Sequence, residues 1–354
     1  MKITIAVMLA LMLPVLLPAQ NKTLHVQDAT KLKVKMGSND GFFNDATCDT
    51  KGNIYVTIFD PRGTPSERPL LKFDSAGILQ AQFESSRKDL GLSEYEDHNE
   101  PSALLPDGGV ARLAWSKDTL YVTKFSSDGT FVSRMKLDSP AFLPYQFLVF
   151  PSGEMFAAGL EHSHSVRSIS PYKRFTAIYD AKGHLLKRLV LPGDAEIEAA
   201  IEAGDSRYAM APMSGNRAVT RGRARLGEDG NVYLMRGTSP PLFYVISSSG
   251  ELVRTVKVEP PFSGQVPSEM QLVKGRIAVE FWLGCDAGGQ CSGVNLEVAD
   301  AVSGEGLARY DHDNFFGSLA CYNSGPDLLT SLTLDNNQPQ MTRWAAKQPV
   351  VIHP

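Results

Sequence analysis

The sequence predicts an all-β fold, a six-bladed β-propeller of four-stranded antiparallel blades. Two observations predict it. A phrase that consists of apolar residues, a turn ending in Gly and an alternating apolar strand occurs six times in the 354 residues. A second hairpin signal follows each occurrence, and its turn contains Gly in the first five units. Each unit therefore contains two hairpins and four short strands, and repeats of this kind are typical of propellers.

The first turn of each unit carries the clearest signal. It reads CDTKGNIYV in the first unit, and related phrases recur at 104–115 (LLPDGGVARLAW), 148–159 (LVFPSGEMFAAG), 224–235 (ARLGEDGNVYLM), 272–281 (LVKGRIAVEF) and 321–332 (CYNSGPDLLTSL). Neighbouring turn glycines are 45 to 77 residues apart, and they are Gly52, Gly108, Gly153, Gly230, Gly275 and Gly325. Glycine suits tight hairpin turns because these turns need positive φ angles.

The second turn follows in phrases such as KFDSAGILQAQF (72–83) and VISSSGELVRTVKV (245–258), and it is degenerate in the sixth unit. The flanking strands contain the Val, Ile, Phe, Tyr and Thr that favour a pleated surface. A two-layer β-sandwich is the alternative all-β fold, but it does not require the same pair of hairpins six times.

The phrases DTKGNIYVT…LLKFDSAGIL and GEDGNVYLM…YVISSSGELV resemble blades of NHL-type six-bladed propellers, which belong to the broader TolB-like group. The resemblance covers most of residues 42–345 and implies the blade architecture. Enzymes of this fold include lactonases, which use Glu, Asn and Asp around a divalent ion, and peptidyl-hydroxyglycine lyases, which use several His around zinc. The starts of the six units here contain one His, so the resemblance implies no particular activity.

The predicted organisation is a signal peptide at 1–19 and a single propeller domain at 20–354. A strand-like segment at about 23–36 would close the ring by pairing with the last unit, since a sheet edge is otherwise exposed. The longest spacing leaves room for an insertion, in which GDAEIEAAIEAG (193–204) predicts a short helix. The predicted blades cover about 42–84, 99–138, 144–192, 219–258, 266–310 and 315–345.

The N-terminal segment predicts export. Lys2 precedes a mostly apolar run of 15 residues, Ile3 to Leu17, and the small residue Ala19 follows it. This is the layout of a cleavable signal peptide, and the run is short for a membrane span. An uncleaved anchor is the alternative. We therefore expect a secreted or periplasmic protein with no membrane span after signal cleavage.

The composition excludes one class of partner. Charged residues form 21% and apolar residues 43% of the chain, and the net charge is −4. Because no basic field exists to hold a phosphate backbone, we expect no binding to nucleic acid. We expect a globular monomer.

Four cysteines in an exported chain permit two disulfides. Cys285 and Cys291 flank the flexible stretch DAGGQ, which would allow a local bridge. Cys48 and Cys321 each precede the first-turn glycine of their unit by four residues, so they occupy equivalent positions in the first and last blades. A Cys48–Cys321 disulfide would staple the ring and stabilise it by roughly 4–5 kcal/mol in the chain-entropy model. Two buried free thiols are the alternative.

Candidate site residues lie in or beside the long connections. The tight turns are expected on one face of the disc, which leaves the long connections on the other, and function concentrates on loops held by a rigid scaffold. The long connections include 60–69, 85–101, 161–174, 284–293 and 311–317, and the largest insertion is 192–222.

Two of these connections carry weak candidates for metal ligands. His162 and His164 are two residues apart, so in an extended segment both would point to one side, as a metal pair does. His98 begins a neighbouring unit, and Glu100 or Glu161 would complete a ligand set. The alternative is that these are solvated loop residues.

The starts of the units carry weak candidates for ligand binding. Arg221 and Arg223 would meet an anionic ligand group or pair with local carboxylates. Asn44 and Glu269 are amide and acid candidates at two other unit starts, but they form no recognisable catalytic set.

Searches for catalytic motifs find no P-loop, G-x-G-x-x-G, H-E-x-x-H or G-x-S-x-G pattern in the sequence. The sequence therefore favours a non-catalytic binding or scaffold propeller without a cofactor. Its ligand would be a peptide, a glycan or a protein held on the long-loop face. The alternative is a metal-dependent hydrolase or lyase, lactonase-like or peptidyl-hydroxyglycine-lyase-like, with a divalent cation at the mouth of the central channel.

Overall fold

The computed structural model describes residues 20–34, 42–59, 69–84, 101–116, 119–139, 142–161, 174–196, 199, 223–238, 240–263, 265–282, 294–312, 317–324, 328–335 and 338–346. Within these ranges the backbone forms strands and turns, apart from helical geometry at residues 194–196 and 199. These helical residues fall in the insertion at 193–204 for which a short helix was predicted.

Four sheets are four-stranded, antiparallel and built from consecutive strands. The first contains β2 (Phe42–Cys48), β3 (Ile54–Phe59), β4 (Leu70–Phe73) and β5 (Leu79–Phe83). The second contains β6 (Ser102–Leu104), β7 (Val110–Ser116), β8 (Thr119–Phe125) and β9 (Phe131–Lys136). The third contains β10 (Phe142–Val149), β11 (Met155–Glu161), β12 (Arg174–Tyr179) and β13 (Leu185–Arg188). The fourth contains β14 (Ala224–Leu226), β15 (Val232–Arg236), β16 (Leu242–Ile246) and β17 (Leu252–Lys257).

The remaining strands form one eight-stranded sheet in the order β18-β19-β20-β21-β1-β24-β23-β22. One half consists of β18 (Val266–Val273), β19 (Arg276–Trp282), β20 (Val294–Asp300) and β21 (Gly306–His312). The other half consists of β22 (Ser318–Asn323), β23 (Leu328–Asp335), β24 (Gln338–Ala346) and β1 (Gln20–Lys31). Neighbouring strands are antiparallel within each half, and the halves meet through the parallel pair β1–β21.

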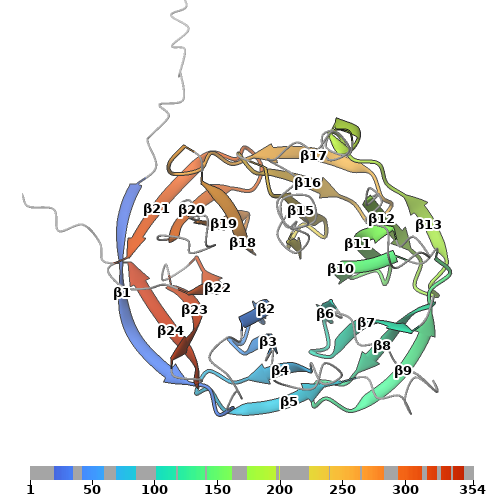
Figure 1. The fold of residues 1–354 in the computed structure, drawn as a ribbon, viewed down its shortest axis with the longest axis horizontal. Coiled ribbons are helices and arrows are strands. Elements are labelled where there is room, and N and C mark those ends of the chain that lie inside the picture. Colours follow the sequence, from blue (N-terminus) through green and yellow to red (C-terminus); the bar gives the residue numbers. More distant parts are fainter. Residues whose placement is uncertain are drawn as a thin grey trace, which may run out of the picture.

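The sheets stand radially around a central opening, as Figure 1 shows. The inner strands of the sheets, such as β2, β6, β10, β18 and β22, lie nearest the centre, and β5, β9, β13, β17 and β1 lie at the rim. This arrangement confirms the predicted all-β propeller of four-stranded antiparallel blades. The predicted count of six does not appear as six separate sheets, because hydrogen bonds between β1 and β21 merge the last eight strands into one.

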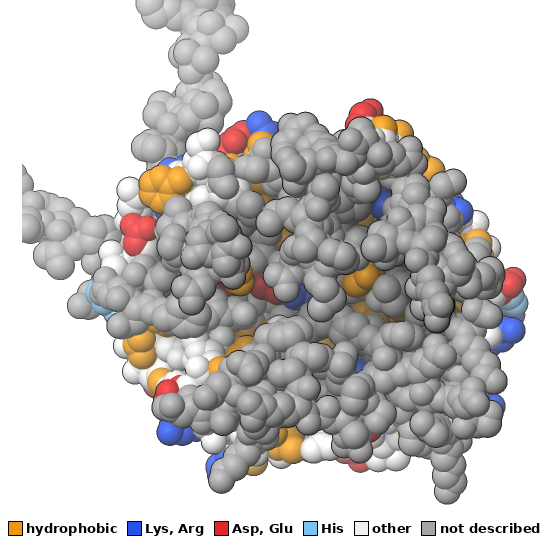
Figure 2. Space-filling view, in the orientation of Figure 1, with side chains coloured by type: hydrophobic (Ala, Val, Ile, Leu, Met, Phe, Trp, Pro, Cys, Tyr) orange, Lys and Arg blue, Asp and Glu red, His pale blue; other side chains and the backbone are white. Residues whose placement is uncertain are grey.

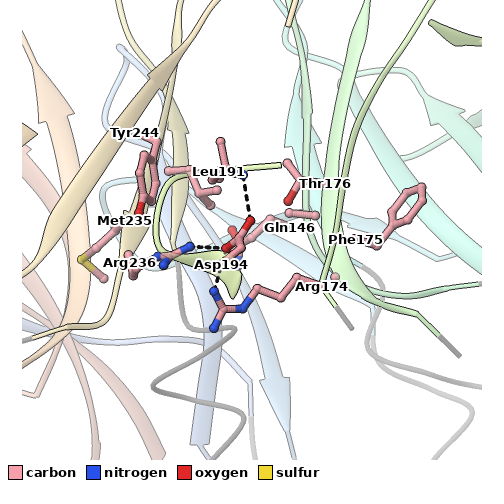
Figure 3. A pocket seen from close by; sticks show the side chains of 12 residues that line it. Gln146, Arg174, Phe175, Thr176, Leu191, Asp194, Met235, Arg236 and Tyr244 are labelled. Atoms are coloured by element: carbon pink, nitrogen blue, oxygen red, sulfur yellow. Dashed lines mark hydrogen bonds and ion pairs between the residues drawn. The ribbon is translucent and has the colours of Figure 1, made fainter. Parts of the chain in front are cut away.

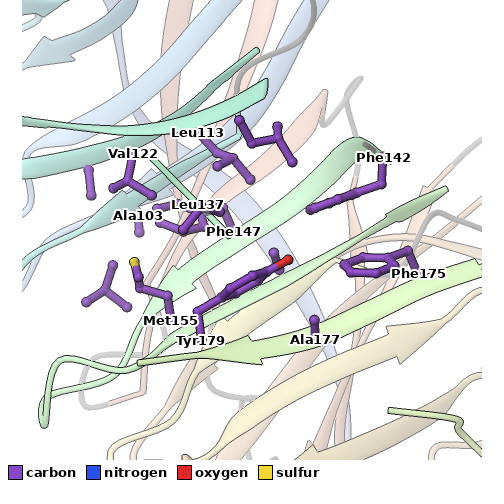
Figure 4. Packing of buried hydrophobic residues seen from close by; sticks show 14 residues of the cluster. Ala103, Leu113, Val122, Leu137, Phe142, Phe147, Met155, Phe175, Ala177 and Tyr179 are labelled. Atoms are coloured by element: carbon purple, nitrogen blue, oxygen red, sulfur yellow. The ribbon is translucent and has the colours of Figure 1, made fainter. Parts of the chain in front are cut away.

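The hydrophobic core is divided among the gaps between neighbouring sheets. Figure 4 shows one such cluster, in which Leu113 and Val122 of one sheet face Phe147, Met155 and Tyr179 of the next. Within the same cluster the rings of Phe142 and Phe175 stack, with centroids 4.3 Å apart. Similar clusters fill the other gaps, including the one between the two halves of the eight-stranded sheet. The propeller therefore gains its stability from contacts between sheets.

The two hairpin turns of each unit have the glycine geometry that the sequence predicts. Among the described residues, five first-turn glycines have φ between +73° and +100°, namely Gly52, Gly108, Gly153, Gly230 and Gly275. The second-turn glycines have φ between +72° and +90°, and they are Gly77, Gly129, Gly183, Gly250 and Gly304. Gly325, the sixth predicted first-turn glycine, lies outside the described residues.

Two connections join the ends of the ring. The N-terminal strand β1 pairs antiparallel with β24, from Leu24 opposite Ala346 to Lys31 opposite Gln340. The Cys48–Cys321 disulfide joins β2 to β22, with a Cα–Cα distance of 5.6 Å across a sequence separation of 273 residues. The predicted disulfide is thereby confirmed.

Candidate functional site

The inner strands all begin on one side of the disc, which we call the entry face. Phe42, at the start of β2, lies opposite Phe59, at the end of β3, so the first turn lies at the far end of both strands. The same pairing places the starts of β6, β10, β14, β18 and β22 on this face. The long connections that follow β3, β11 and β19 leave from here, as predicted, but most of their residues lie outside the described part of the chain.

Two side chains reach across the centre to a single carbonyl. Arg225 of β14 donates from Nη2 to the oxygen of Ala46 at 3.1 Å, and Gln271 of β18 donates from Nε2 to the same oxygen at 3.3 Å. The sheets β2–β5 and β14–β17 stand on opposite sides of the opening (Figure 1). The carbonyl is available because β2 has a bulge between Asn44 and Thr47, and a bulge leaves a residue outside the ladder. Two side chains therefore span the centre at this depth.

An ion pair lies one step closer to the entry face. Side chains alternate along a strand, so residues two apart project to the same side. Arg223 therefore projects to the same side as Arg225, and Glu269 to the same side as Gln271. Arg223 Nη2 donates to Glu269 Oε1, and the two side chains are 17% and 12% exposed. Both residues were sequence candidates for ligand binding, and the structure brings them together as a pair. Figure 2 shows acidic and basic side chains next to each other at the bottom of the central opening.

A second carboxyl group lies beside Glu269. Glu280, on β19, is the register partner of Glu269 and is fully buried. It accepts hydrogen bonds from Ser268 Oγ, Trp282 Nε1 and the Leu319 backbone N–H, each at 2.6 Å. Burial, reinforced by the nearby Glu269 charge, raises the pKa of Glu280 to about 7. The sequence reasoning missed Glu280, although an acid within the apolar run RIAVEFW was a signal for it.

A cavity of about 50 Å³ lies between the third and fourth sheets (Figure 3). It is near the entry face, because β12 begins and β15 ends there. Its polar lining consists of Gln146, Arg174, Thr176, Asp194, Arg236 and Tyr244. Its apolar lining includes Phe175, Leu191 and Met235. None of these residues was a candidate from the sequence, because they come from four strands and one loop that are far apart along the chain.

Two arginines share one carboxylate at this cavity. Asp194 Oδ1 accepts a hydrogen bond from Arg174 Nη1 at 2.7 Å and another from Arg236 Nη2. Asp194 Oδ2 accepts the Leu191 backbone N–H at 2.8 Å, which holds the carboxylate in place. The three side chains are only 7–10% exposed.

Tyr244 forms the aromatic wall of the cavity. The Arg236 guanidinium lies over its ring, 5.0 Å from the centroid, and its hydroxyl donates to the Pro192 carbonyl at 2.6 Å. Burial raises the pKa of Tyr244, and the adjacent Arg236 charge opposes this rise. Tyr244 is therefore neutral at physiological pH and contributes no negative charge to the site.

Several sequence candidates cannot be placed around this site. Seven of them lie outside the described residues, namely His98, Glu100, His162, His164, Arg221, Cys285 and Cys291. The backbone of Asn44 lies in β2 opposite Thr57. Over the described ranges no group of three or more His, Cys, Asp or Glu side chains is arranged to hold a metal ion. Nor does any helix in those ranges have the length and apolar character to cross a membrane.

Comparisons with known proteins find no matching family model and no matching curated protein. A luciferin-regenerating enzyme aligns with 90% of this chain and 96% of its own at a TM-score of 0.50 and 11% identity. The Dos1 propeller aligns over 89% of this chain and 82% of its own, with a TM-score of 0.46 and 8% identity. A protein of unknown function from Bacteroides caccae aligns over 77% of this chain and 87% of its own, with a TM-score of 0.45 and 12% identity. At such identities the likeness is one of fold alone, and this chain is similar to proteins built as β-propellers.

Proposed function

We propose that the chain is a six-bladed propeller of the NHL or TolB-like kind, in which each half of the eight-stranded sheet is one blade. Both halves have four antiparallel strands, and an apolar cluster lies between them as it does between separate sheets. The last blade takes its outer strand, β1, from the N-terminus, so the blade combines both ends of the chain.

We further propose that this propeller is an exported, non-catalytic binding protein that holds a peptide, glycan or protein on its entry face. The observation that carries the proposal is that the side chains of Arg225 and Gln271 meet on the Ala46 carbonyl across the centre. These contacts fix polar side chains across the channel, with the Arg223–Glu269 pair one step closer to the entry face. A concave site with a few fixed polar groups suits ligand binding.

Export is supported by the Cys48–Cys321 disulfide, since structural disulfides persist in oxidising compartments. N-terminal sequencing of the protein recovered outside the cytoplasm tests this part. A start at Gln20 is expected. Recovery of the whole protein in the cytoplasm with reduced Cys48 and Cys321 would refute export.

The binding function is tested by screening the purified protein on peptide and glycan arrays. The informative variant carries Arg223→Met together with Glu269→Gln, because replacing both members of the buried pair leaves neither of these two charges without the other. Lys51→Gln, on an exposed first turn at the opposite face, is the control. We expect the double variant to lose at least about tenfold in affinity, which corresponds to roughly 1.4 kcal/mol, and the control to bind normally. Equal binding by all forms, loss in the control, or turnover of the bound compound would contradict the proposal.

A further inference from the structure

One oxygen of the Arg223–Glu269 ion pair has no partner. Glu269 accepts the Arg223 hydrogen bond with Oε1, whereas its Oε2 is buried and has no hydrogen-bond partner among the described residues. The residue as a whole is 9% exposed. A buried carboxylate oxygen without a donor is unfavourable, so a donor brought by a ligand would be stabilised at this oxygen.

Glu269 and Glu280 form a carboxyl pair on neighbouring strands. They are register partners in β18 and β19, so both side chains project to the same side of the sheet, with their Cβ atoms about 5 Å apart. Glu280 accepts its hydrogen bonds from three uncharged groups, the Ser268 hydroxyl, the Trp282 indole N–H and the Leu319 backbone N–H. Like charges directly opposite each other repel. A positive charge beside Glu269 Oε2 would relieve this repulsion.

The strands on either side of Glu280 present uncharged groups to it. Leu296 of β20 lies opposite Glu280 in the ladder, and Leu319 of β22 contacts it through the backbone. Glu269 contributes a negative charge beside it, and the positive charge of Arg223 is bonded to Glu269. The ionised form of Glu280 would therefore be stabilised by a cation that a ligand supplies.

We propose that the carboxyl pair binds the primary ammonium group of a ligand, with Glu269 Oε2 as the main acceptor. This inference rests on the proposed binding function and deepens it by naming the chemical group that the ligand presents. The Glu269 side chain is 12% exposed, and Figure 2 shows acidic and basic side chains open to solvent at the bottom of the central opening. The last torsion of a glutamate side chain is soft, so a small rotation presents Oε2 to an entering group.

The free acceptor favours an ammonium group over other cations. An ammonium group is a compact point charge that suits one oxygen, whereas a guanidinium group prefers both oxygens of a carboxylate. Because Oε1 of Glu269 already binds Arg223, a second guanidinium group would meet only one oxygen. A calcium ion takes about six to eight oxygen ligands. Over the described part of the chain, no three His, Cys, Asp or Glu side chains are arranged to hold a metal ion.

The buried carboxyl group gives this site a characteristic pH dependence. Burial raises the pKa of Glu280 to about 7, so this group is partly protonated at pH 7. An ammonium group nearby favours the ionised form, so binding of the ligand would release a proton from Glu280. By linkage, the affinity for an ammonium ligand should rise by up to about tenfold between pH 6 and pH 8.

The test is calorimetric titration of the full chain with n-butylammonium chloride between pH 6 and pH 8. Sodium chloride and tetramethylammonium chloride at equal ionic strength are the comparison salts, because tetramethylammonium carries the charge without an N–H donor. Glu269→Gln should weaken butylammonium binding at least about tenfold, since it removes the charged acceptor. Glu280→Gln imitates the protonated acid and should abolish the rise in affinity with pH. Glu251→Gln, the same chemical change at an exposed position beside a second turn, should leave binding unchanged.

Matched pairs of larger probes identify the source of the ammonium group. Nα-acetyllysine amide is compared with Nα-acetylnorleucine amide, and glucosamine is compared with glucose. Binding of the lysine compound alone assigns the site to a peptide or protein ligand, and binding of glucosamine alone assigns it to a glycan. Equal binding of glucose and glucosamine would contradict recognition of a charged group.

Saturable butylammonium binding that Glu269→Gln weakens, with a pH dependence that Glu280→Gln removes, supports the site. Thermal midpoints report whether the variants are folded, and Arg223→Met combined with Glu269→Gln replaces the single variant if that one does not fold. Absence of saturable butylammonium binding, equal binding of tetramethylammonium, tighter binding of sodium, or unchanged binding in the folded variant would overturn it. If the array ligand still depends on Arg223 and Glu269 while butylammonium does not bind, the proposed function stands and the ammonium site is wrong.

Discussion

At the scale of single residues, buried charged groups connect one sheet to the next. Glu280 of β19 accepts the backbone N–H of Leu319, in the inner strand of the neighbouring half-sheet. Arg112 of β7 donates to the Phe83 carbonyl, at the end of β5, at 2.7 Å. Each contact satisfies a backbone group where two sheets meet, so a buried charge here positions the sheets relative to each other.

Glu280 predicts a pH dependence of stability. Its pKa is raised from 4.5 to about 7 in the folded chain, so the folded state binds more protons than the unfolded state between these values. The free energy of unfolding should therefore fall as pH rises through this window, by about 3 kcal/mol for a fully buried group. Glu297, whose pKa is also raised to about 7 by burial, adds a change of the same sign.

Replacing Glu280 with Gln should remove about half of this decline. Urea denaturation of the wild type and of Glu280→Gln from pH 5 to pH 8 gives the two slopes directly. Glu196→Gln, which changes an exposed carboxyl group, should keep the wild-type slope. An identical pH dependence in wild type and Glu280→Gln would show that Glu280 is ionised throughout this range.

At the scale of elements, the two turns of a unit use glycine for different reasons. Gly52, in a first turn, has φ +80°, and no atom lies within 4 Å of the position that a Cβ would take there. Gly77, in a second turn, has φ +72°, and the corresponding Cβ position is 2.9 Å from the Lys31 carbonyl oxygen and from Thr30 Cγ2. Second turns therefore pack against the outer strand of the preceding sheet, which for the first unit is β1.

This difference predicts unequal effects of alanine. Gly52→Ala should reduce the free energy of unfolding by about 1–2 kcal/mol, which is the usual cost of a left-handed conformation for a residue with a Cβ. Gly77→Ala should reduce it by about 1–3 kcal/mol more, because overpacking against Lys31 and Thr30 adds to the same backbone cost. Chemical denaturation of both variants measures the difference. Equal losses would mean that the second turn does not press against β1 in solution.

At the scale of the whole molecule, the first and last parts of the chain are held together twice. Near the centre, Cys48 and Cys321 join β2 to β22, and β1 pairs with β24 farther out. Both connections link segments that are hundreds of residues apart, so each one restricts the unfolded chain strongly. The pairing also covers the edges of β24 and β21, which would otherwise invite aggregation.

The disulfide should dominate the stability of ring closure. Cys48→Ser combined with Cys321→Ser is expected to lower the free energy of unfolding by about 5 kcal/mol, because the unfolded chain regains the entropy of a very long loop. Equilibrium denaturation measures this loss, and treating the wild type with reductant should produce a similar one. An unchanged denaturation midpoint in the double variant would mean that β1 alone closes the ring.

The sequence by itself determined the repeated unit and therefore the propeller. Turn glycines such as Gly52 and Gly77 have local conformational requirements, and alternating apolar residues mark strands over a few positions, so both signals can be recognised without tertiary information. Cys48 and Cys321 were also predictable as a pair, because equivalent positions in neighbouring repeats become neighbours in space. Arg223 and Glu269 were singled out separately, and no local signal showed that they face each other.

Only the tertiary structure decided which side chains meet at the centre and in the cavity. The cavity brings together Arg236 of β15, Gln146 of β10 and Asp194 of the segment after β13. Their proximity depends on how the third and fourth sheets pack. The Ala46 carbonyl became an acceptor for Arg225 and Gln271 through a bulge on the opposite side of the ring. Such contacts arise from the relative placement of whole sheets, which burial of apolar surface sets collectively, and no short stretch of sequence encodes them.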